Sequence, residues 1–238
     1  MLDANHPDFP PPPGNPALWR YTGLAKFIDL LERRELQFPR SDKFADPYEG
    51  VLPRQNVANL DAASGPPISS VRAMYETLRR TMYISCWFAS EHESAAMWHL
   101  YSQGGDCIAI RTDLNTLGNC LAPSPLTCRI CDVKYIDYDR DLLPSMNGLV
   151  PFVHKRLSFQ HENEVRAIIW SLEGVNVPHV VAGVERIAVA IDPAVLIRGV
   201  HIAPTAKPWF GELVELVLKR YAVPCPVTRS SLFERPTY

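Results

Sequence analysis

The sequence of 238 residues lacks three common motifs that bind phosphate or carry a serine nucleophile. It contains no G-x-x-x-x-G-K-[ST] segment, no G-x-G-x-x-G after a strand pattern and no G-x-S-x-G segment. These absences exclude, in turn, a standard phosphate-binding loop, a standard Rossmann dinucleotide site and the nucleophile elbow of the α/β-hydrolases. Functional residues therefore have to be sought among scattered side chains.

The sequence also lacks any apolar run near the roughly 18 residues that a membrane-spanning helix needs. Its start, Met-Leu-Asp-Ala-Asn-His-Pro-Asp, shows no basic segment followed by an apolar one, so we expect no secretory signal. We therefore expect a cytoplasmic protein with no membrane partner. The formal net charge of −2 argues against binding nucleic acid mainly through the phosphate backbone, and leaves a local basic groove open.

Patterns of metal ligands are incomplete in this chain. Cys128 and Cys131 have the spacing of half a zinc site, but no second pair of ligands follows them. His92 and Glu93 begin like the H-E-x-x-H motif, but position 96 is alanine. We therefore expect the six cysteines to be reduced thiols, as in cytosolic proteins, and we expect no bound metal.

The composition is that of a globular protein, with 47% apolar and 21% charged residues. Residues 1–17 include four consecutive prolines and predict a mobile, Pro-rich N-terminal arm. Because nothing later resembles a linker, we expect residues 18–238 to form a single domain. Strand and helix patterns interleave without a regular βαβ rhythm, which favours an α+β fold with a mixed or antiparallel, split sheet and flanking helices.

Hydrophobic spacing and turn residues predict several local elements. We expect a loop over residues 51–67, a helix over residues 149–157 and a short strand at Val180–Val181. Residues 209–221 predict an amphipathic helix. The side chains expected to face the core on that helix are those of Leu213, Leu216, Val217 and Tyr221.

The most informative segment holds two carboxylates two residues apart, Glu162 and Glu164, at the start of an apolar, β-prone run. Alternate residues of a strand share one face, so we expect both carboxylates on the same side of a strand. Adjacent acids repel each other, which suits a site that stabilises a positively charged transition state. A solvated strand end neutralised by Arg166 is the structural alternative.

Two further residues stand out from their surroundings. Arg20 lies between Trp19 and Tyr21 in a strand pattern, where it either points outward or binds an anion through its guanidinium fork. Ser85 is a small hydroxyl residue among bulky residues in a strand pattern. It is either a core serine whose hydroxyl is hydrogen-bonded within the protein, or a residue that leaves room for a ligand and hydrogen-bonds to it.

An arginine, a serine and a Glu-x-Glu segment, in this order and each on its own strand, resemble the Arg–Ser–Glu arrangement of the ADP-ribosyltransferase superfamily. The spacings, 65 residues from Arg20 to Ser85 and 79 from Ser85 to Glu164, are compatible with it. The second motif departs from the superfamily, because Ser85-Cys86-Trp87 stands where Ser-Thr-Ser is common.

The resemblance implies an ADP-ribosyltransferase-like fold and NAD as substrate. Arg20 and the neighbouring Tyr21 would bind NAD, with Arg20 at its diphosphate, and Ser85 would position the nicotinamide ribose or Glu164. Glu164 would stabilise the oxocarbenium-like cation, and Glu162 would orient or deprotonate an acceptor, which is a protein side chain, a nucleic-acid base or water. Trp87 and further residues would bind or line the site: Trp98, Tyr101, Asp46, Glu49 and Arg166.

The chain also resembles an uncharacterised bacterial family, domain of unknown function family 2971. The resemblance rests on Leu18-Trp19-Arg20-Tyr21, Phe44-Ala45-Asp46-Pro47-Tyr48-Glu49, Ser85-Cys86-Trp87, Ala96-Met97-Trp98-x-x-Tyr101 and Glu162-x-Glu164-x-Arg166. It covers roughly residues 18–170 and names no activity. A bacterial stress, toxin or phage-defence role is the setting we expect.

Two other classes of function stay open at this point. In a non-catalytic nucleotide- or protein-binding module, Arg20, Asp46 and the two glutamates would form a buried charge network. In a metal-dependent hydrolase or nuclease, Asp46, Glu49, Glu162 and Glu164 would surround Mg²⁺.

Overall fold

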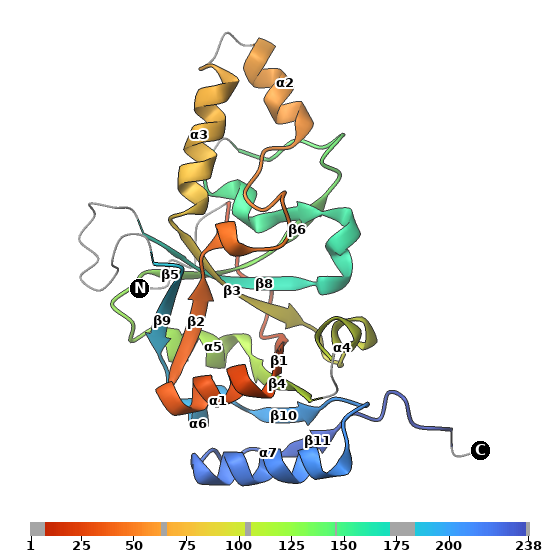
Figure 1. Ribbon diagram of the computed structural model, residues 1–238. Coiled ribbons are helices and arrows are strands. Elements are labelled where there is room, and N and C mark those ends of the chain that lie inside the picture. Colours follow the sequence, from red (N-terminus) through yellow and green to blue (C-terminus); the bar gives the residue numbers. More distant parts are fainter. Residues whose placement is uncertain (1–7, 63–65, 103–105, 146, 172–183, 237–238) are drawn as a thin grey trace. The chain divides into compact units, whose positions relative to one another are not determined.

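The computed structural model describes residues 8–62, 66–102, 106–145, 147–171 and 184–236 (Figure 1). The chain divides into two compact units, which are described one at a time. Unit 1 comprises Met1–Pro12, Gln37–Cys86 and Ser124–Ala188, and unit 2 comprises Pro13–Leu36, Trp87–Pro123 and Val189–Tyr238. Residues 1–7 of the expected arm and the strand expected at Val180–Val181 lie outside the described residues.

Unit 1 contains three strands of the large sheet, two helices and a set of short elements. Its elements are η1 (Ser41–Lys43), α2 (Arg54–Ala62), α3 (Ile68–Arg79), the first part of β3 (Met82–Ala89), β5 (Cys128–Asp132), β6 (Lys134–Ile136), η2 (Val150–Val153), β7 (His154–Arg156), η3 (Leu157–Glu162) and β8 (Glu164–Trp170).

Unit 2 contains the remaining strands of that sheet and most of the helices. Its elements are β1 (Ala17–Gly23), α1 (Leu24–Arg33), the end of β3, α4 (Ala95–Tyr101), β4 (Cys107–Asp113), α5 (Leu114–Leu121), α6 (Pro193–Leu196), β10 (Gly199–Ile202), α7 (Pro208–Arg220) and β11 (Val227–Arg229). Two strands, β2 (Glu35–Pro39) and β9 (Arg186–Ala190), each contribute residues to both units.

The strands are ordered β11-β10-β4-β1-β3-β8-β5 in a seven-stranded sheet, with two further two-stranded sheets, β2-β9 and β6-β7. Within unit 2, β4 pairs antiparallel with β1 and β10, whereas β10 pairs parallel with β11. Within unit 1, β5 and β8 are antiparallel, and Cys131 lies opposite Arg166. The sheet is therefore mixed and helices accompany it, which confirms the predicted α+β class.

The core of unit 1 gathers apolar side chains from segments far apart in the sequence. Val71 and Tyr75 of α3 pack in one cluster with Ile84 of β3 and Phe152 of η2. Phe9 belongs to the same cluster and is 5% exposed, and Asp8 accepts hydrogen bonds from Ser145 and Asn147. The described start of the N-terminal arm is thus packed against unit 1.

A tight turn over residues 46–50 presents Glu49 to the interior. The Asp46 carboxylate accepts a hydrogen bond from the backbone N–H of Tyr48, and its carbonyl accepts one from Glu49. Gly50 has φ +67°, and a Cβ atom there would collide with the ring of Phe152. Glycine is therefore required at position 50, since any other residue would shift the turn that holds Glu49.

Two local predictions are wrong. Residues 51–67 were expected to be a loop, but α2 occupies Arg54–Ala62, and its partly buried Val57 and Leu60 pack against the core of unit 1. The helix expected over residues 149–157 is instead η2 followed by β7, because β7 pairs in parallel with β6 and an extended chain is needed there. In both places tertiary packing overrides weak local signals.

The helix predicted over residues 209–221 is present as α7, but its buried face differs from the prediction. Phe210, Val214 and Leu218 are the buried residues of this helix. Leu216, expected to face the core, is 64% exposed, and Trp209 is 52% exposed. The buried stripe is offset because an i, i+4, i+8 row of this helix, rather than Leu216, faces the unit 2 core.

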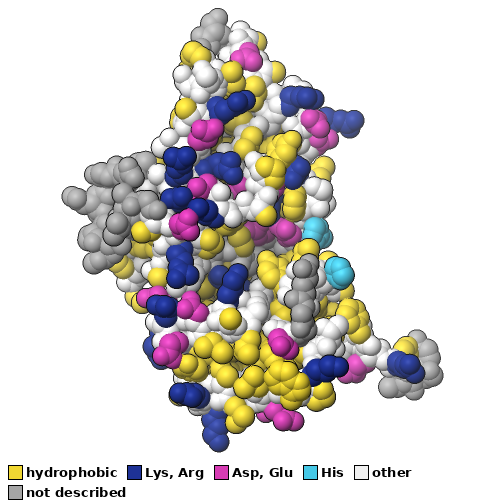
Figure 2. All heavy atoms as spheres, viewed as in Figure 1, with side chains coloured by type: hydrophobic (Ala, Val, Ile, Leu, Met, Phe, Trp, Pro, Cys, Tyr) yellow, Lys and Arg dark blue, Asp and Glu magenta, His cyan; other side chains and the backbone are white. Residues whose placement is uncertain are grey.

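The surface carries charges of both signs. On the face shown in Figure 2, basic and acidic side chains are interspersed, as expected for a net charge of −2. Among the helices that the structure describes, none is both long and apolar enough to cross a membrane. All six cysteines are free thiols, and four of them are buried.

Candidate functional site

The two glutamates of the Glu-x-Glu segment do not lie on one strand, which corrects the prediction. Glu162 ends η3, Asn163 has φ 33° in the left-handed region, and Glu164 begins β8. The left-handed residue breaks the strand alternation on which the prediction relied. The carboxylates nevertheless converge, because the Lys155 ammonium of β7 donates to Oε2 of Glu162 and, over 3.0 Å, to Oε2 of Glu164.

Arg166 lies two residues after Glu164 on the same strand and is bound on both sides by carboxylates. Its Nη1 and Nη2 donate to the two oxygens of Glu49 over 2.5 and 2.9 Å. Its Nε and Nη2 donate to the two oxygens of Glu164 over 2.9 and 3.2 Å. The planar guanidinium fork suits such bidentate pairing, and the arginine is fully buried.

These five residues form a charge cluster that runs inward from the surface of unit 1. We call Glu49, Lys155, Glu162, Glu164 and Arg166 the charge cluster. Side-chain exposure falls from 22% at Glu162 to 10% at Lys155 and 5% at Glu164, and it is 0% at Arg166 and Glu49. With three carboxylates and two cations, the ionised cluster has one net negative charge.

Electrostatics keep the Glu164 carboxylate ionised. Burial by itself raises the pKa of Glu164, but the positive charges of Arg166 and Lys155 outweigh burial and lower that pKa to about 2. Burial likewise works against a charged Lys155, and the carboxylates of Glu164 and Glu162 raise the pKa of this lysine above its usual value. The Cys86 thiol of β3 has a raised pKa because of its burial and the nearby Glu164 charge.

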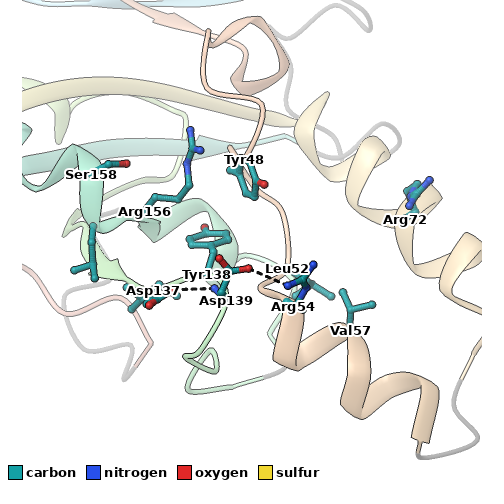
Figure 3. A pocket seen from close by; sticks show the side chains of 12 residues that line it. Tyr48, Leu52, Arg54, Val57, Arg72, Asp137, Tyr138, Asp139, Arg156 and Ser158 are labelled. Atoms are coloured by element: carbon teal, nitrogen blue, oxygen red, sulfur yellow. Dashed lines mark hydrogen bonds and ion pairs between the residues drawn. The ribbon is translucent and has the colours of Figure 1, made fainter.

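A cavity of about 740 Å³ in unit 1 is lined in part by Arg156 of β7 and Ser158 of η3 (Figure 3). The same two elements carry Lys155 and Glu162. The Arg156 guanidinium stands 4.2 Å from the ring centroid of Tyr48 and donates to Asp46 over 2.8 Å. The Tyr48 ring meets that of Tyr138 edge to face at 5.6 Å. Asp46, an expected site residue, is thus paired with Arg156. This pairing could not be predicted from the sequence.

The expected site residues of unit 2 form a second group, around β1 and α4. The guanidinium of Arg20 lies 5.6 Å from the ring centroid of Trp87, the residue that begins the unit 2 part of β3. Tyr21 meets Trp98 edge to face at 4.8 Å and stacks on Tyr101 at 6.2 Å. Trp98 is 1% exposed, as a core residue is, whereas Tyr101 is 51% exposed.

Hydrogen bonds fix this aromatic group at the start of α4. The Tyr21 hydroxyl accepts from the backbone N–H of Ser94 over 2.8 Å, and burial raises the pKa of Tyr21 to about 12. The Trp98 indole N–H donates to Glu93 over 2.6 Å. Tyr21 therefore stays neutral at physiological pH and serves as a fixed aromatic surface.

The strands that carry Arg20, Ser85 and Glu164 are β1, β3 and β8, which follow one another in the strand order of the sheet. Ser85 is fully buried. In the part of the chain that the structure describes, no three His, Cys, Asp or Glu side chains are grouped as metal ligands.

Sequence reasoning missed Lys155 and the pairing of Glu49 with Arg166. Lys155 follows an apolar run that predicts a helix. The contact of its ammonium group with two glutamates could therefore not be predicted from the local sequence. Glu49 and Arg166 are 117 positions apart, and no local pattern links them. Their pairing arises only when the turn over residues 46–50 folds against β8.

No protein-family model matches the chain, so the resemblance to domain of unknown function family 2971 is not confirmed and stays a prediction. No curated protein matches it either. Similar solved structures include DarT of Thermus sp. 2.9 in complex with NAD⁺, at 9% identity and a TM-score of 0.44, covering 92% of this chain and 97% of that chain.

The same Thermus protein in complex with ADP-ribosylated ssDNA is similar at 9% identity and a TM-score of 0.45, covering 93% of this chain and 97% of that one. The complex with carba-NAD⁺ gives 9% identity and a TM-score of 0.42, covering 90% and 95%.

Proposed function

We propose that the protein is an NAD-dependent, ADP-ribosyltransferase-like or NAD-cleaving enzyme. The observation that carries the proposal is the succession of β1, β3 and β8, which bear Arg20, Ser85 and Glu164 on neighbouring strands. The Arg–Ser–Glu resemblance likewise has an arginine, a serine and a glutamate in this chain order, each on its own strand. The proposal extends to a cytoplasmic setting in a bacterial stress, toxin or phage-defence system.

In the proposed reaction, the bond between C1′ of the ribose and the nicotinamide nitrogen breaks. Its electron pair leaves with neutral nicotinamide, and the ribose acquires oxocarbenium character. An acceptor oxygen or nitrogen then bonds to C1′ and loses its proton to Glu162. The acceptor is a protein side chain, a nucleic-acid base or water, and the sequence resemblance does not distinguish among these three.

The charge cluster supports the cation-stabilising part of this role. A carboxylate can stabilise the cation only when it is ionised, and the lowered pKa of Glu164 keeps it ionised at neutral pH. With all five groups ionised, the charge cluster has one net negative charge, which favours a positive charge nearby; burial raises the pKa of Glu49, whereas Glu164 stays ionised. Glu162 is its most exposed carboxylate, in keeping with contact to an acceptor.

The proposal assigns NAD binding to residues of β1 and β3. Arg20 would bind the diphosphate, because a guanidinium donates parallel hydrogen bonds to phosphate oxygens. Ser85 would position the nicotinamide ribose or Glu164, and Trp87 and Tyr101 would offer aromatic faces. Asp46, Glu49, Trp98 and Arg166 would support the site, the last through its pairing with Glu164.

A second candidate function is a non-catalytic binding module, and one observation favours it. Both oxygens of Glu164 accept hydrogen bonds from Arg166, and one also accepts from Lys155, so the carboxylate is fully engaged. In such a module the charge cluster would fix β8 relative to β7 and the turn at residue 49, without taking part in a reaction.

Thermal unfolding with and without millimolar NAD tests the binding part of the proposal. Saturating NAD at about 100 times its Kd should raise the melting temperature by about 5 °C or more, and Arg20→Ala should remove this increase. Arg111→Ala is a matched control, since the Arg111 guanidinium lies 5.5 Å from the ring centroid of Trp19, also in unit 2.

The control should keep the stabilisation by NAD. An equal loss in both variants would show that Arg20 has no particular role. No stabilisation of the wild-type protein would favour the non-catalytic module, and loss of activity in EDTA would favour the metal-dependent hydrolase.

A further inference from the structure

The exposed face of α7 carries an apolar row that the unit 2 core does not use. Trp209, Leu213, Leu216 and Arg220 follow one another at spacings of four, three and four residues, which is the period of a coiled-coil seam. Trp209 and Leu216 are 52% and 64% exposed. The opposite face of the helix buries Phe210, Val214 and Leu218 in unit 2.

The charges that border this row have a particular arrangement. Glu212 directly precedes Leu213 in the sequence, and Lys219 directly precedes Arg220. Both side chains are exposed, and they are seven residues apart, so they occupy the same position of the seven-residue period. Within the described part of the chain, neither side chain has an ion pair or side-chain hydrogen bond. One is acidic and lies near the N-terminal end, and the other is basic and lies near the C-terminal end.

An antiparallel pair of α7 helices satisfies all of these groups. In such a pair Leu213 of one copy packs on Leu216 of the other, and Trp209 faces the aliphatic and guanidinium parts of Arg220. Glu212 of each copy lies opposite Lys219 of the second copy, so the two-fold axis generates two ion pairs. In a parallel pair the position of Glu212 would instead face Val217 of the second copy, so neither Glu212 nor Lys219 would meet an opposite charge.

We propose that α7 is a self-complementary interface through which two copies of this chain pair antiparallel. The exposed row, its bordering charges and the two-fold symmetry of a homodimer all favour a second copy of α7 as the partner. A contact of one 13-residue helix per copy is small, so the dimer forms in a concentration-dependent way, with a Kd of about micromolar size. The proposal is independent of the reaction proposed for this protein.

Sedimentation equilibrium of the full chain over about 1 to 300 μM tests the interface. The wild-type protein should shift from monomer to dimer over this range, and Leu216→Glu should stay monomeric. Leu142→Glu is the matched control, because Leu142 is 52% exposed but lies in unit 1. It should dimerise like the wild type.

Charge reversals test the antiparallel register. Glu212→Lys and Lys219→Glu should each weaken dimerisation about tenfold or more, because like charges then face each other. The double variant Glu212→Lys/Lys219→Glu should recover dimerisation, and a mixture of the two single variants should form heterodimers. A monomer at every concentration, a dimer that survives Leu216→Glu, or no recovery in the double variant would overturn the proposal.

Discussion

Two arginines on strands of the sheet have different environments in the two units. Arg166 in unit 1 is 0% exposed, and its guanidinium is paired with Glu49 and Glu164. Arg20 in unit 2 is only partly buried, with its guanidinium beside the ring of Trp87. The same residue type is thus surrounded by carboxylates in one unit and placed next to an aromatic ring in the other.

The comparison separates a structural role from a ligand-binding role. A buried charge surrounded by opposite charges cannot be removed without leaving those charges unpaired in a medium of low polarity. A partly exposed arginine leaves no such buried charges behind when it is removed, and its guanidinium lies near the surface, where an anion can approach. We therefore expect substitutions at Arg166 to act on stability and those at Arg20 to act on NAD binding.

The largest expected effect comes from Arg166→Met. It leaves Glu49 and Glu164 buried without their common partner, so the free energy of unfolding should fall by about 3–5 kcal/mol. Urea unfolding followed by circular dichroism measures the change. Arg33→Met is the control, since its pair with Asp29 is exposed, and it should leave the free energy of unfolding nearly unchanged. Equal effects would remove the distinction between the two kinds of site.

Glu164→Gln should have the next largest effect on stability. The amide keeps an acceptor oxygen but loses the charge that pairs with Arg166 and Lys155, so we expect a loss of about 2 kcal/mol. We therefore expect a folded but less stable protein. An unfolding midpoint equal to that of the wild type would show that the ion pairs contribute little.

Acid should weaken the fold through the same residue. The pKa of Glu164 is lowered in the folded protein from its usual 4.5 to about 2, so its ionised form stabilises the fold above about pH 4.5. This contribution should be lost progressively as the pH falls from about 4.5 towards 2. Urea midpoints measured across this interval should fall less steeply in Glu164→Gln, and parallel curves for the two proteins would contradict the assignment.

Arg20→Ala should have the smallest effect on stability. Arg20 is only partly buried, so its removal should cost less stability than removal of the fully buried Arg166. The variant should nevertheless lose its stabilisation by NAD, as described above. A destabilisation as large as that of Arg166→Met would mean that Arg20 belongs to the structural framework, and the contrast between the units would disappear.

Elements with a strong local signal could be predicted from the sequence, and contacts over long distances could not. Interleaved strand and helix patterns predicted the α+β class, and helical spacing predicted α7. The buried face of α7 was wrong because several apolar rows share this helix, and only packing selects one of them. The α2 helix was missed because its sequence has little amphipathic character.

The candidate site divides in the same way. The residue types of the Glu-x-Glu segment indicated a charged site, and the structure does gather Glu162 and Glu164 around Lys155. The expected geometry was wrong because Asn163 adopts a left-handed conformation, for which a single asparagine is a weak signal. The packing of Phe9 into unit 1 likewise depends on residues more than a hundred positions away.

Release of nicotinamide from NAD by the purified protein tests the central claim most directly. It should be measured in wild type and Glu164→Gln at a temperature where circular dichroism shows both to be folded. The account predicts release by the wild type and at least about a hundredfold less by the variant, with NAD still raising the melting temperature of both. Undiminished release by folded Glu164→Gln, or none by an NAD-stabilised wild type, would contradict it.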